Sequence, residues 1–185
     1  MKKILIIDIE TTGFSHTKNS IIEIGIVSLD LDTGDIRVLF DHILHEEKTT
    51  PEEVEKSWVI ENSGITALMI HHSPKLSHFK EHIQSIIEMY PLGSTAYNNQ
   101  FDFGFLEDRG FKFPVKLPCP MKLSTDICKI PAKYGKSGYK WPSCEEAYKH
   151  FFPDEDYVEQ HRGADDAVHE AKIVKELYDL KIFKL

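Results

Sequence analysis

Two acidic residues stand at the end of the first apolar segment of the chain. Asp8 interrupts the apolar run from Ile4 to Ile9, and Glu10 follows it directly. The run has the composition of a buried strand. Positions i and i+2 of a strand share a face, so both carboxylates emerge together and repel each other when they lose water. Carboxylate oxygens suit Mg²⁺ or Mn²⁺, and a bound cation would remove that repulsion. The alternative is a strand that simply reaches solvent at Asp8.

A third carboxylate, Asp102, follows a short apolar segment that ends at Asn98. The spacing places Asp102 in the first turn of a helix, where an acidic side chain often does no more than complement the helix dipole. Asp102 therefore becomes informative only together with the other acids.

His161 and two acids, Asp165 and Asp166, lie at the boundary between a loop and the last helix expected in the chain. A histidine in the loop and an acid in the first helical turn can face a common point. Because 3.6 residues make one turn, the two acids differ by ~100° around the helix, and the pattern does not decide which of them faces the site. The alternative is an exposed histidine beside an ordinary helix start.

The secondary structure expected from the sequence must position these acids and the histidine. It consists of three strands, followed by strands that alternate with helices. A turn at Asp32-Thr33-Gly34-Asp35 joins two of the first three strands, which predicts a meander. Residues 110–142 are expected to be irregular, with one strand or short helix around 123–128. The pattern as a whole predicts a mixed-sheet α/β domain. The expected strands cover residues 4–9, 21–29, 36–44 and 94–97. A short helix is expected to begin at Pro51, and longer helices are expected over 74–90, 101–108, 143–152 and 163–180.

The chain has 185 residues and a net charge of −8, and its length suits one domain. Its 41% apolar content supports a packed core, and no apolar run approaches the ~20 residues that span a bilayer. The three cysteines have no C-x-x-C spacing, so neither a disulfide framework nor a zinc site is indicated. Asp8 interrupts the N-terminal apolar run too early for a signal peptide, so we expect a cytoplasmic protein with no membrane partner.

The charge is unevenly distributed along the chain. Residues 109–144 hold eight basic side chains and one acid, a net of +7, between flanks of −10 and −5. Aromatic residues lie among them, as in surfaces that follow phosphates and stack bases. A solvated lysine-rich loop explains the segment equally well. Its basic residues are Arg109, Lys112, Lys116, Lys122, Lys129, Lys133, Lys136 and Lys140, and its aromatic residues are Phe111, Phe113, Tyr134, Tyr139 and Trp141.

The ordered set of acids and histidine resembles the three motifs of the DEDDh family of 3′-to-5′ exonucleases. The motifs read Asp8-Ile9-Glu10-Thr11-Thr12-Gly13, then Asn98-Asn99-Gln100-Phe101-Asp102, then His161 through Asp166. The resemblance implies a ribonuclease H-like α/β fold, with a central mixed five-stranded sheet flanked by helices, and a single exonuclease domain over residues 1–185. Gly163 stands where the family commonly has alanine, a difference that we expect to matter little.

The same resemblance assigns roles to individual residues. It implies a general base, His161, and four carboxylates that bind two divalent cations, Mg²⁺ or Mn²⁺. The family's fourth acid follows its histidine by five positions, which selects Asp166 over Asp165. A sister subfamily has a tyrosine four positions before the last acid, where this chain has Arg162, so the histidine type is favoured. The four metal ligands are then Asp8, Glu10, Asp102 and Asp166.

The implied reaction is hydrolysis of phosphodiester bonds at the 3′ end of DNA or RNA, which releases nucleoside 5′-monophosphates by a two-metal mechanism. The substrate would be a single-stranded or 3′-end nucleic acid, in proofreading, repair or turnover, and a DNA polymerase is a partner that the family allows. The sequence does not choose between DNA and RNA and leaves the oligomeric state open. The residues expected to receive the terminal nucleotide are Thr11, Thr12, Gly13, Phe14, Ile65 and Asn98.

Two other functions compete with this one. A phosphatase of the haloacid dehalogenase type also opens with a strand that ends in two acids, but its second acid is normally Asp, where this chain has Glu10, and it needs a separate lysine. The second competitor is a non-catalytic ribonuclease H-like module that only binds nucleic acid or a partner. Retention of all five polar groups of the motifs argues against a decayed site, since clustered polar groups are costly to bury.

Overall fold

Three long antiparallel strands form the centre of the computed structural model, which describes residues 2–132 and 137–185. They are β1 (Lys3–Thr11), β2 (Ile21–Asp30) and β3 (Ile36–Ile43), and the short β4 (Ser94–Thr95) pairs parallel to β1. The strand order is β3-β2-β1-β4, and the meander predicted from the sequence is confirmed. Lys133, Tyr134 and Lys136 of the basic segment lie outside the described residues.

Within the described residues the sheet has four strands, so the expected fifth strand is not confirmed. Its place is taken by a single parallel bridge between Ser94 and Lys116. Pro114 and Pro118 flank this bridge closely, and neither can donate a backbone hydrogen bond, so the pairing does not extend into a ladder.

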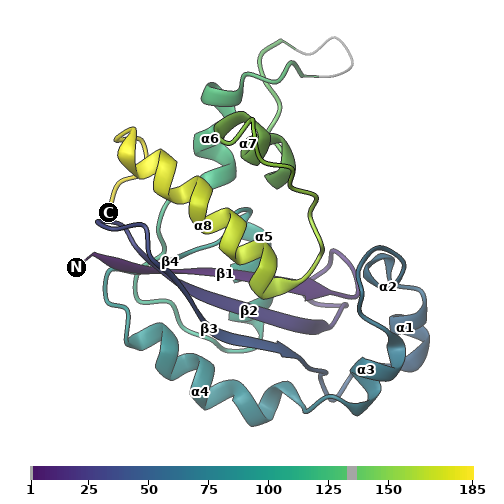
Figure 1. The fold of residues 1–185 in the computed structure, drawn as a ribbon. Coiled ribbons are helices and arrows are strands. Elements are labelled where there is room, and N and C mark those ends of the chain that lie inside the picture. The colour runs from purple at the N-terminus through teal and green to yellow at the C-terminus, as the bar shows by residue number, and fades with distance from the viewer. Residues whose placement is uncertain (1, 133–136) are drawn as a thin grey trace.

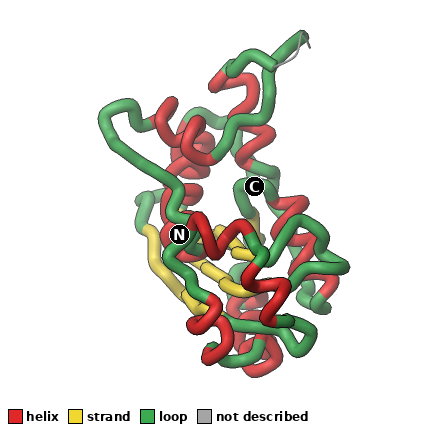
Figure 2. The backbone as a smooth tube through the Cα atoms, turned by 90° about the vertical axis from the view of Figure 1, so that its right-hand side faces the viewer, coloured by secondary structure: helices red, strands yellow, loops and turns green. Residues whose placement is uncertain are grey.

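Eight helices are assigned in the described residues, and they cover both faces of the sheet (Figures 1 and 2). Ser143 and Glu146 form a capping box, in which each side chain accepts a hydrogen bond from the other residue's backbone N–H. None of the described helices is long and apolar enough to cross a membrane. The helices are α1 (Pro51–Glu55), α2 (Trp58–Asn62), α3 (Ala67–His72), α4 (Leu76–Glu88), α5 (Asn99–Asp108), α6 (Pro120–Cys128), α7 (Cys144–Phe151) and α8 (Gly163–Asp179).

The alternation of side chains along β1 decides which helices face the acids. Ile4 and Ile6 pack with residues of α7 and α8, whereas Leu5 and the other odd-numbered side chains pack against α4 and α5. Asp8 and Glu10 are even-numbered, so they emerge on the face that α8 covers (Figure 1).

Helix α8 approaches the sheet closely because two glycines meet there. A Cβ atom at Gly25 would lie 2.0 Å from the carbonyl carbon of Gly163, and one at Gly163 would lie 2.6 Å from the Gly25 nitrogen. Gly25 pairs with Asp8 across the sheet, so this contact places the first turn of α8 beside the two acids of β1. The expectation that glycine at 163 matters little is therefore wrong, since alanine there would displace the helix.

Candidate active site

Three of the four expected metal-binding acids, Asp8, Glu10 and Asp102, line one pocket of about 640 Å³ at the C-terminal end of β1. The fourth, Asp166, is not among the described residues that line it. It is bounded by the end of β1, the turn that follows it, α2, the start of α5, the loop before α8, and α8 itself. Thr11, Gly13 and Asn98 line it as well. Its acidic lining residues are Asp8, Glu10, Asp102, Glu159 and Glu170.

Burial and mutual repulsion dominate the electrostatics of this pocket. Burial raises the pKa of Asp8 well above its usual range, and the charges of Glu170 and Glu10 raise it further. Burial, followed by the charge of Asp166, does the same to the pKa of Glu10. Burial raises the pKa of Asp102 to about 8, opposed by hydrogen bonds with the backbone of Asp102 and Ile9. The acids outnumber the described cations beside them, Arg162 and Lys56, so the carboxylates are costly to keep ionised together.

Three of the expected residues come together tightly. Ligand atoms of Glu10, His161 and Asp166 all lie within 4.8 Å of one another, which is the one group of this kind among the described residues. Asp8 Oδ2 is buried nearby and has no hydrogen-bond partner among the described residues. An orphaned buried oxygen beside a set of carboxylates and an imidazole is chemistry that suits a hard divalent cation. The residues present therefore fit a metal site.

Asp166, not Asp165, lies beside Glu10 and His161. Asp166 is 2% exposed, and its Oδ1 accepts a 2.7 Å hydrogen bond from the Tyr157 hydroxyl. Its Oδ2 accepts a 2.8 Å bond from the backbone N–H of Arg162. Asp165 is exposed and lies near His169 instead. The structure thus resolves a choice that helix geometry alone left open.

The loop that carries His161 is fixed to the sheet by an ion pair. Glu23 on β2 has no exposed side-chain surface, and its Oε1 accepts bonds of 3.0 and 2.8 Å from Nε and Nη2 of Arg162. Its Oε2 accepts a 3.0 Å bond from the backbone N–H of Gly163. His161 adopts a left-handed backbone conformation with φ of 52° directly before this anchor.

Four residues near the site were not anticipated. Glu170 follows Asp166 by one helical turn and is 4% exposed, and its Oε2 accepts a bond from the Tyr97 N–H at 3.2 Å. Burial raises the pKa of Glu159, in the loop before His161, to about 7. The i, i+4 spacing of Asp166 and Glu170 was a signal available in the sequence. The other two, Tyr157 and Trp58, had no such signal.

Trp58 of α2 places its ring against the imidazole of His161. The ring centroids are 4.6 Å apart and the planes meet at 80°, an edge-to-face arrangement. Trp58 remains 54% exposed and lines the pocket. Helix α2 is thus the element that lies beside the expected general base.

The residues expected to receive a nucleotide do not all lie at the pocket. Phe14 is 88% exposed and lines it together with Thr11, Gly13 and Asn98. Thr12 also lines it, but the Thr12 hydroxyl is engaged with Glu53 of α1 and with the Ser20 N–H. Ile65 does not line it.

Ile65 is 1% exposed and packs with buried residues of β2 and α1 to α3. Its place in this separate apolar cluster means that the structure does not bring Ile65 together with the other expected residues. The neighbouring glycine, Gly64, has open space around it.

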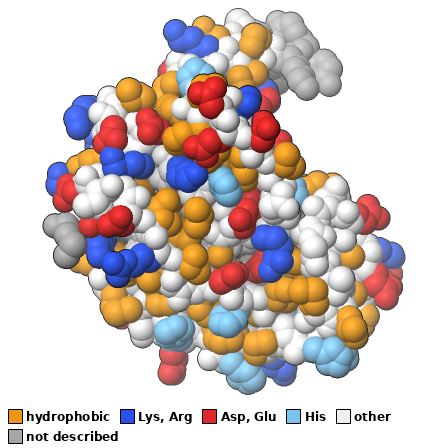
Figure 3. Space-filling model, in the orientation of Figure 1, with side chains coloured by type: hydrophobic (Ala, Val, Ile, Leu, Met, Phe, Trp, Pro, Cys, Tyr) orange, Lys and Arg blue, Asp and Glu red, His pale blue; other side chains and the backbone are white. Residues whose placement is uncertain are grey.

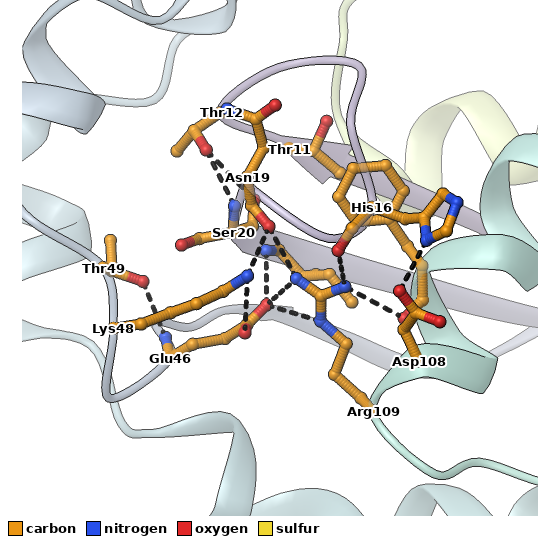
Figure 4. A network of polar contacts seen from close by, with 12 residues as sticks. Thr11, Thr12, His16, Asn19, Ser20, Glu46, Lys48, Thr49, Asp108 and Arg109 are labelled. Carbon is orange, nitrogen blue, oxygen red and sulfur yellow. Dashed lines mark hydrogen bonds and ion pairs between the residues drawn. The ribbon is translucent and has the colours of Figure 1, made fainter.

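Arg109 of the basic segment faces inward. Its guanidinium pairs with Glu46 at 2.9 Å and donates to the carbonyls of His16 and Asn19, in the network of Figure 4. The Arg109 side chain is 9% exposed, so it braces the turn that carries Phe14 and is not a surface group.

Two further cations of the segment are also paired. Lys116 binds Glu107 at 2.7 Å and Lys140 binds Glu146 at 2.6 Å. On the face drawn in Figure 3, basic and acidic side chains are interspersed. Three of the six basic side chains in the described part of the segment are therefore paired with acids, which leaves only part of its positive charge for a substrate.

Solved structures with the same fold share the architecture at low sequence identity. A full-length 3′-exonuclease superposes with a TM-score of 0.67 at 16% identity, covering 98% of this chain and 62% of the other. The nuclease domain of 3′hExo, a DEDDh family member bound to rAMP, gives 0.68 at 16%, covering 99% and 95%. Exonuclease I of E. coli with a dA16 oligonucleotide gives 0.65 at 14%, covering 99% and 42%. The chain thus spans less than two thirds of the first and the last of these proteins.

The fold is therefore the ribonuclease H-like α/β fold expected from the motifs. Among curated proteins, sequence comparison finds no significant match to the chain. A family model described as exonuclease, of the RNase T type, matches residues 5–174. Nucleases of this type use divalent metal ions. Because the match spans nearly the whole chain, the protein belongs to this exonuclease family.

Proposed function

We propose that residues 1–185 form one exonuclease domain of the DEDDh type, which removes nucleoside 5′-monophosphates from the 3′ end of single-stranded DNA or RNA. The observation that carries the proposal is the convergence of ligand atoms of Glu10, His161 and Asp166 within 4.8 Å, beside Asp8 Oδ2, which has no hydrogen-bond partner in the described part of the chain. Two divalent cations, Mg²⁺ or Mn²⁺, would be held there, by Asp8, Glu10, Asp102 and Asp166. When bound, they supply activation of the attacking water and neutralisation of charge on the leaving oxygen.

The residues of the chain divide the remaining work. His161 accepts a proton from the attacking water, because it is the histidine that lines the pocket and has a ring nitrogen within 4.8 Å of carboxylate oxygens of Glu10 and Asp166. Trp58 restrains the imidazole, and the Glu23–Arg162 pair fixes the backbone on its C-terminal side. Phe14 offers an exposed ring for the terminal base.

Digestion of end-labelled substrates tests this function. Matched single-stranded DNA, duplex DNA and short RNA are incubated with Mg²⁺, and the products are resolved by length over time. We expect a ladder that shortens from the 3′ end with release of 5′-monophosphates. Internal cleavage, shortening from the 5′ end or release of inorganic phosphate would each contradict the proposal.

The same assay separates the competing functions. A phosphatase would form an acid-stable aspartyl-phosphate, an acyl phosphate, on Asp8 and liberate inorganic phosphate. A module that only binds nucleic acid would retard the oligonucleotide and leave its length unchanged. A free-standing enzyme and a polymerase partner are distinguished by whether the chain alone shows full activity.

A further inference from the structure

A second, smaller pocket adjoins the catalytic pocket. It has a volume of about 280 Å³ and shares Phe14, Asn98 and Phe101 with the larger one, so the two are contiguous. Five carboxylates line the larger pocket, but no carboxylate is among the described residues that line the smaller one. A polyanion that passes from the catalytic pocket into the smaller one therefore meets a lining without a described carboxylate. The remaining lining residues are His16, Gln100, Phe105 and Trp141.

Trp141 enters this pocket from the basic segment between α6 and α7. It is 59% exposed and belongs to none of the three apolar clusters of the described core. The ammonium of Lys122, in the first turn of α6, lies 5.6 Å from the centroid of its ring. Unlike Lys116 and Lys140, Lys122 pairs with no carboxylate among the described residues. An exposed indole and an available cation therefore stand together.

Aromatic rings continue from the catalytic pocket into the smaller one. Phe14 and Phe101 meet at 6.5 Å between centroids, and Phe101 and Phe105 meet at 4.9 Å. Asn98 and Gln100 add amide groups that can hydrogen-bond a base edge or a sugar hydroxyl. Aromatic faces with basic and amide groups are the elements that bind single strands without sequence preference.

We propose that the smaller pocket, here called the Trp141 subsite, takes the second nucleotide from the 3′ end of the strand whose terminal nucleotide occupies the catalytic pocket. The inference rests on the exonuclease function proposed above. The base of the second nucleotide stacks on Trp141, and the Lys122 ammonium faces a phosphate of the nucleic-acid backbone beside that nucleotide. A mononucleotide reaches only the catalytic pocket, whereas a dinucleotide reaches both.

Binding measured against oligonucleotide length tests the subsite. The wild-type protein and a Trp141→Ala variant are titrated with dAMP and with oligodeoxyadenylates of two to four nucleotides, with Ca²⁺ in place of Mg²⁺ and a check that the oligonucleotide stays intact. Loss of one base stack should weaken binding of the dinucleotide and longer probes roughly 5- to 150-fold. Binding of dAMP should not change, and Trp141→Phe should restore most of the loss.

Tyr139→Ala is the matched control, because Tyr139 is a 46% exposed aromatic of the same segment that lines neither pocket. It should leave the length dependence unchanged. A Lys122→Gln variant should reduce the slope of log affinity against log salt by about 0.7, the value for one phosphate of a single strand.

Two results would overturn the subsite. One is an equal loss for dAMP and the dinucleotide in Trp141→Ala, and the other is no loss for any probe. Mononucleotide release by the wild-type protein is measured alongside. Its absence would refute the exonuclease function, whereas release combined with length-independent binding would refute only the Trp141 subsite.

Discussion

Arg162 and Glu23 join the loop before α8 to the middle of the sheet. The Arg162 guanidinium donates two bonds to Glu23 Oε1, and the Glu23 side chain has no exposed surface. The hydrogen bond with Glu23 raises the pKa of Arg162 above its usual range, so Arg162 stays charged at any working pH. His161 directly precedes Arg162, so the ion pair between Arg162 and Glu23 fixes the position of the His161 backbone, which carries the expected general base.

Replacing Glu23 should therefore affect both stability and activity. Glu23→Gln removes the hydrogen-bonded counter-charge of the partly buried Arg162, and we expect a loss of about 3 kcal/mol in the free energy of unfolding. The rate of hydrolysis should fall because the His161 loop is released. Urea unfolding and initial rates measure the two effects. Full activity in a destabilised variant would show that the anchor is purely structural.

The glycine pair makes a second prediction. Gly163→Ala adds a methyl group 2.6 Å from the Gly25 nitrogen, which should cost about 1–3 kcal/mol by forcing α8 away from β2. Gly64→Ala is the control for replacing glycine by alanine, because a Cβ atom there would have no atom of the described residues within 4 Å. Thermal unfolding compares them. Equal stability of Gly163→Ala and the wild-type protein would mean that the helix start adjusts without cost.

The sequence predicted the long strands well because β1 and β2 are continuous apolar runs. It missed α2 and α3, since helices of five and six residues carry too little periodicity to detect. The helix expected from Pro74 begins at Leu76, because the chain at Lys75 first forms a parallel bridge with His45. Such long-range pairing leaves no local signal.

Some residues of the candidate site could likewise be predicted from the sequence, and others could not. Residues of the three motifs could be named because their types and order are characteristic. The residues that hold them could not, because the contacts between Tyr157 and Asp166 and between Trp58 and His161 depend on how distant segments pack. The basic segment predicted a substrate surface only in part. Arg109 forms a buried ion pair with Glu46, whereas Lys122 lies over the Trp141 ring and pairs with no carboxylate of the described residues.

Stability should depend on pH through Asp102. Its pKa is raised to about 8 in the folded protein, so ionisation penalises the folded state, and the penalty grows as pH rises from about 4 to about 8. Asp102→Asn removes the penalty. In the presence of a chelator, we expect this variant to be more stable than the wild-type protein near pH 8, with the difference vanishing near pH 4.

Saturating Mg²⁺ should make the wild-type protein more stable than Asp102→Asn near pH 8. A ligand that binds only the folded wild-type protein raises its free energy of unfolding. Urea unfolding at two pH values, with and without Mg²⁺, gives all four comparisons. A stability difference that does not change with pH would remove the charge explanation.

Trp58 should act through His161. Trp58→Ala is expected to lower kcat with little change in KM, and Trp58→Phe should recover much of the loss because it keeps an edge-to-face ring. His161→Ala should lower kcat by about 10²–10⁴-fold. The double variant separates the two roles: if Trp58 works by positioning the imidazole, adding Trp58→Ala to His161→Ala should cost nothing further.

Asp166 and Asp165 provide the most direct test of the site as a whole. They are adjacent on α8, but Asp166 is buried beside Glu10 and His161, whereas Asp165 faces solvent. Mg²⁺-dependent release of mononucleotides from a 3′ end is measured for Asp166→Asn and Asp165→Asn. Release should be abolished in the first variant and near wild-type in the second. Equal activity in the two variants, or full activity in Asp166→Asn, would contradict the assignment.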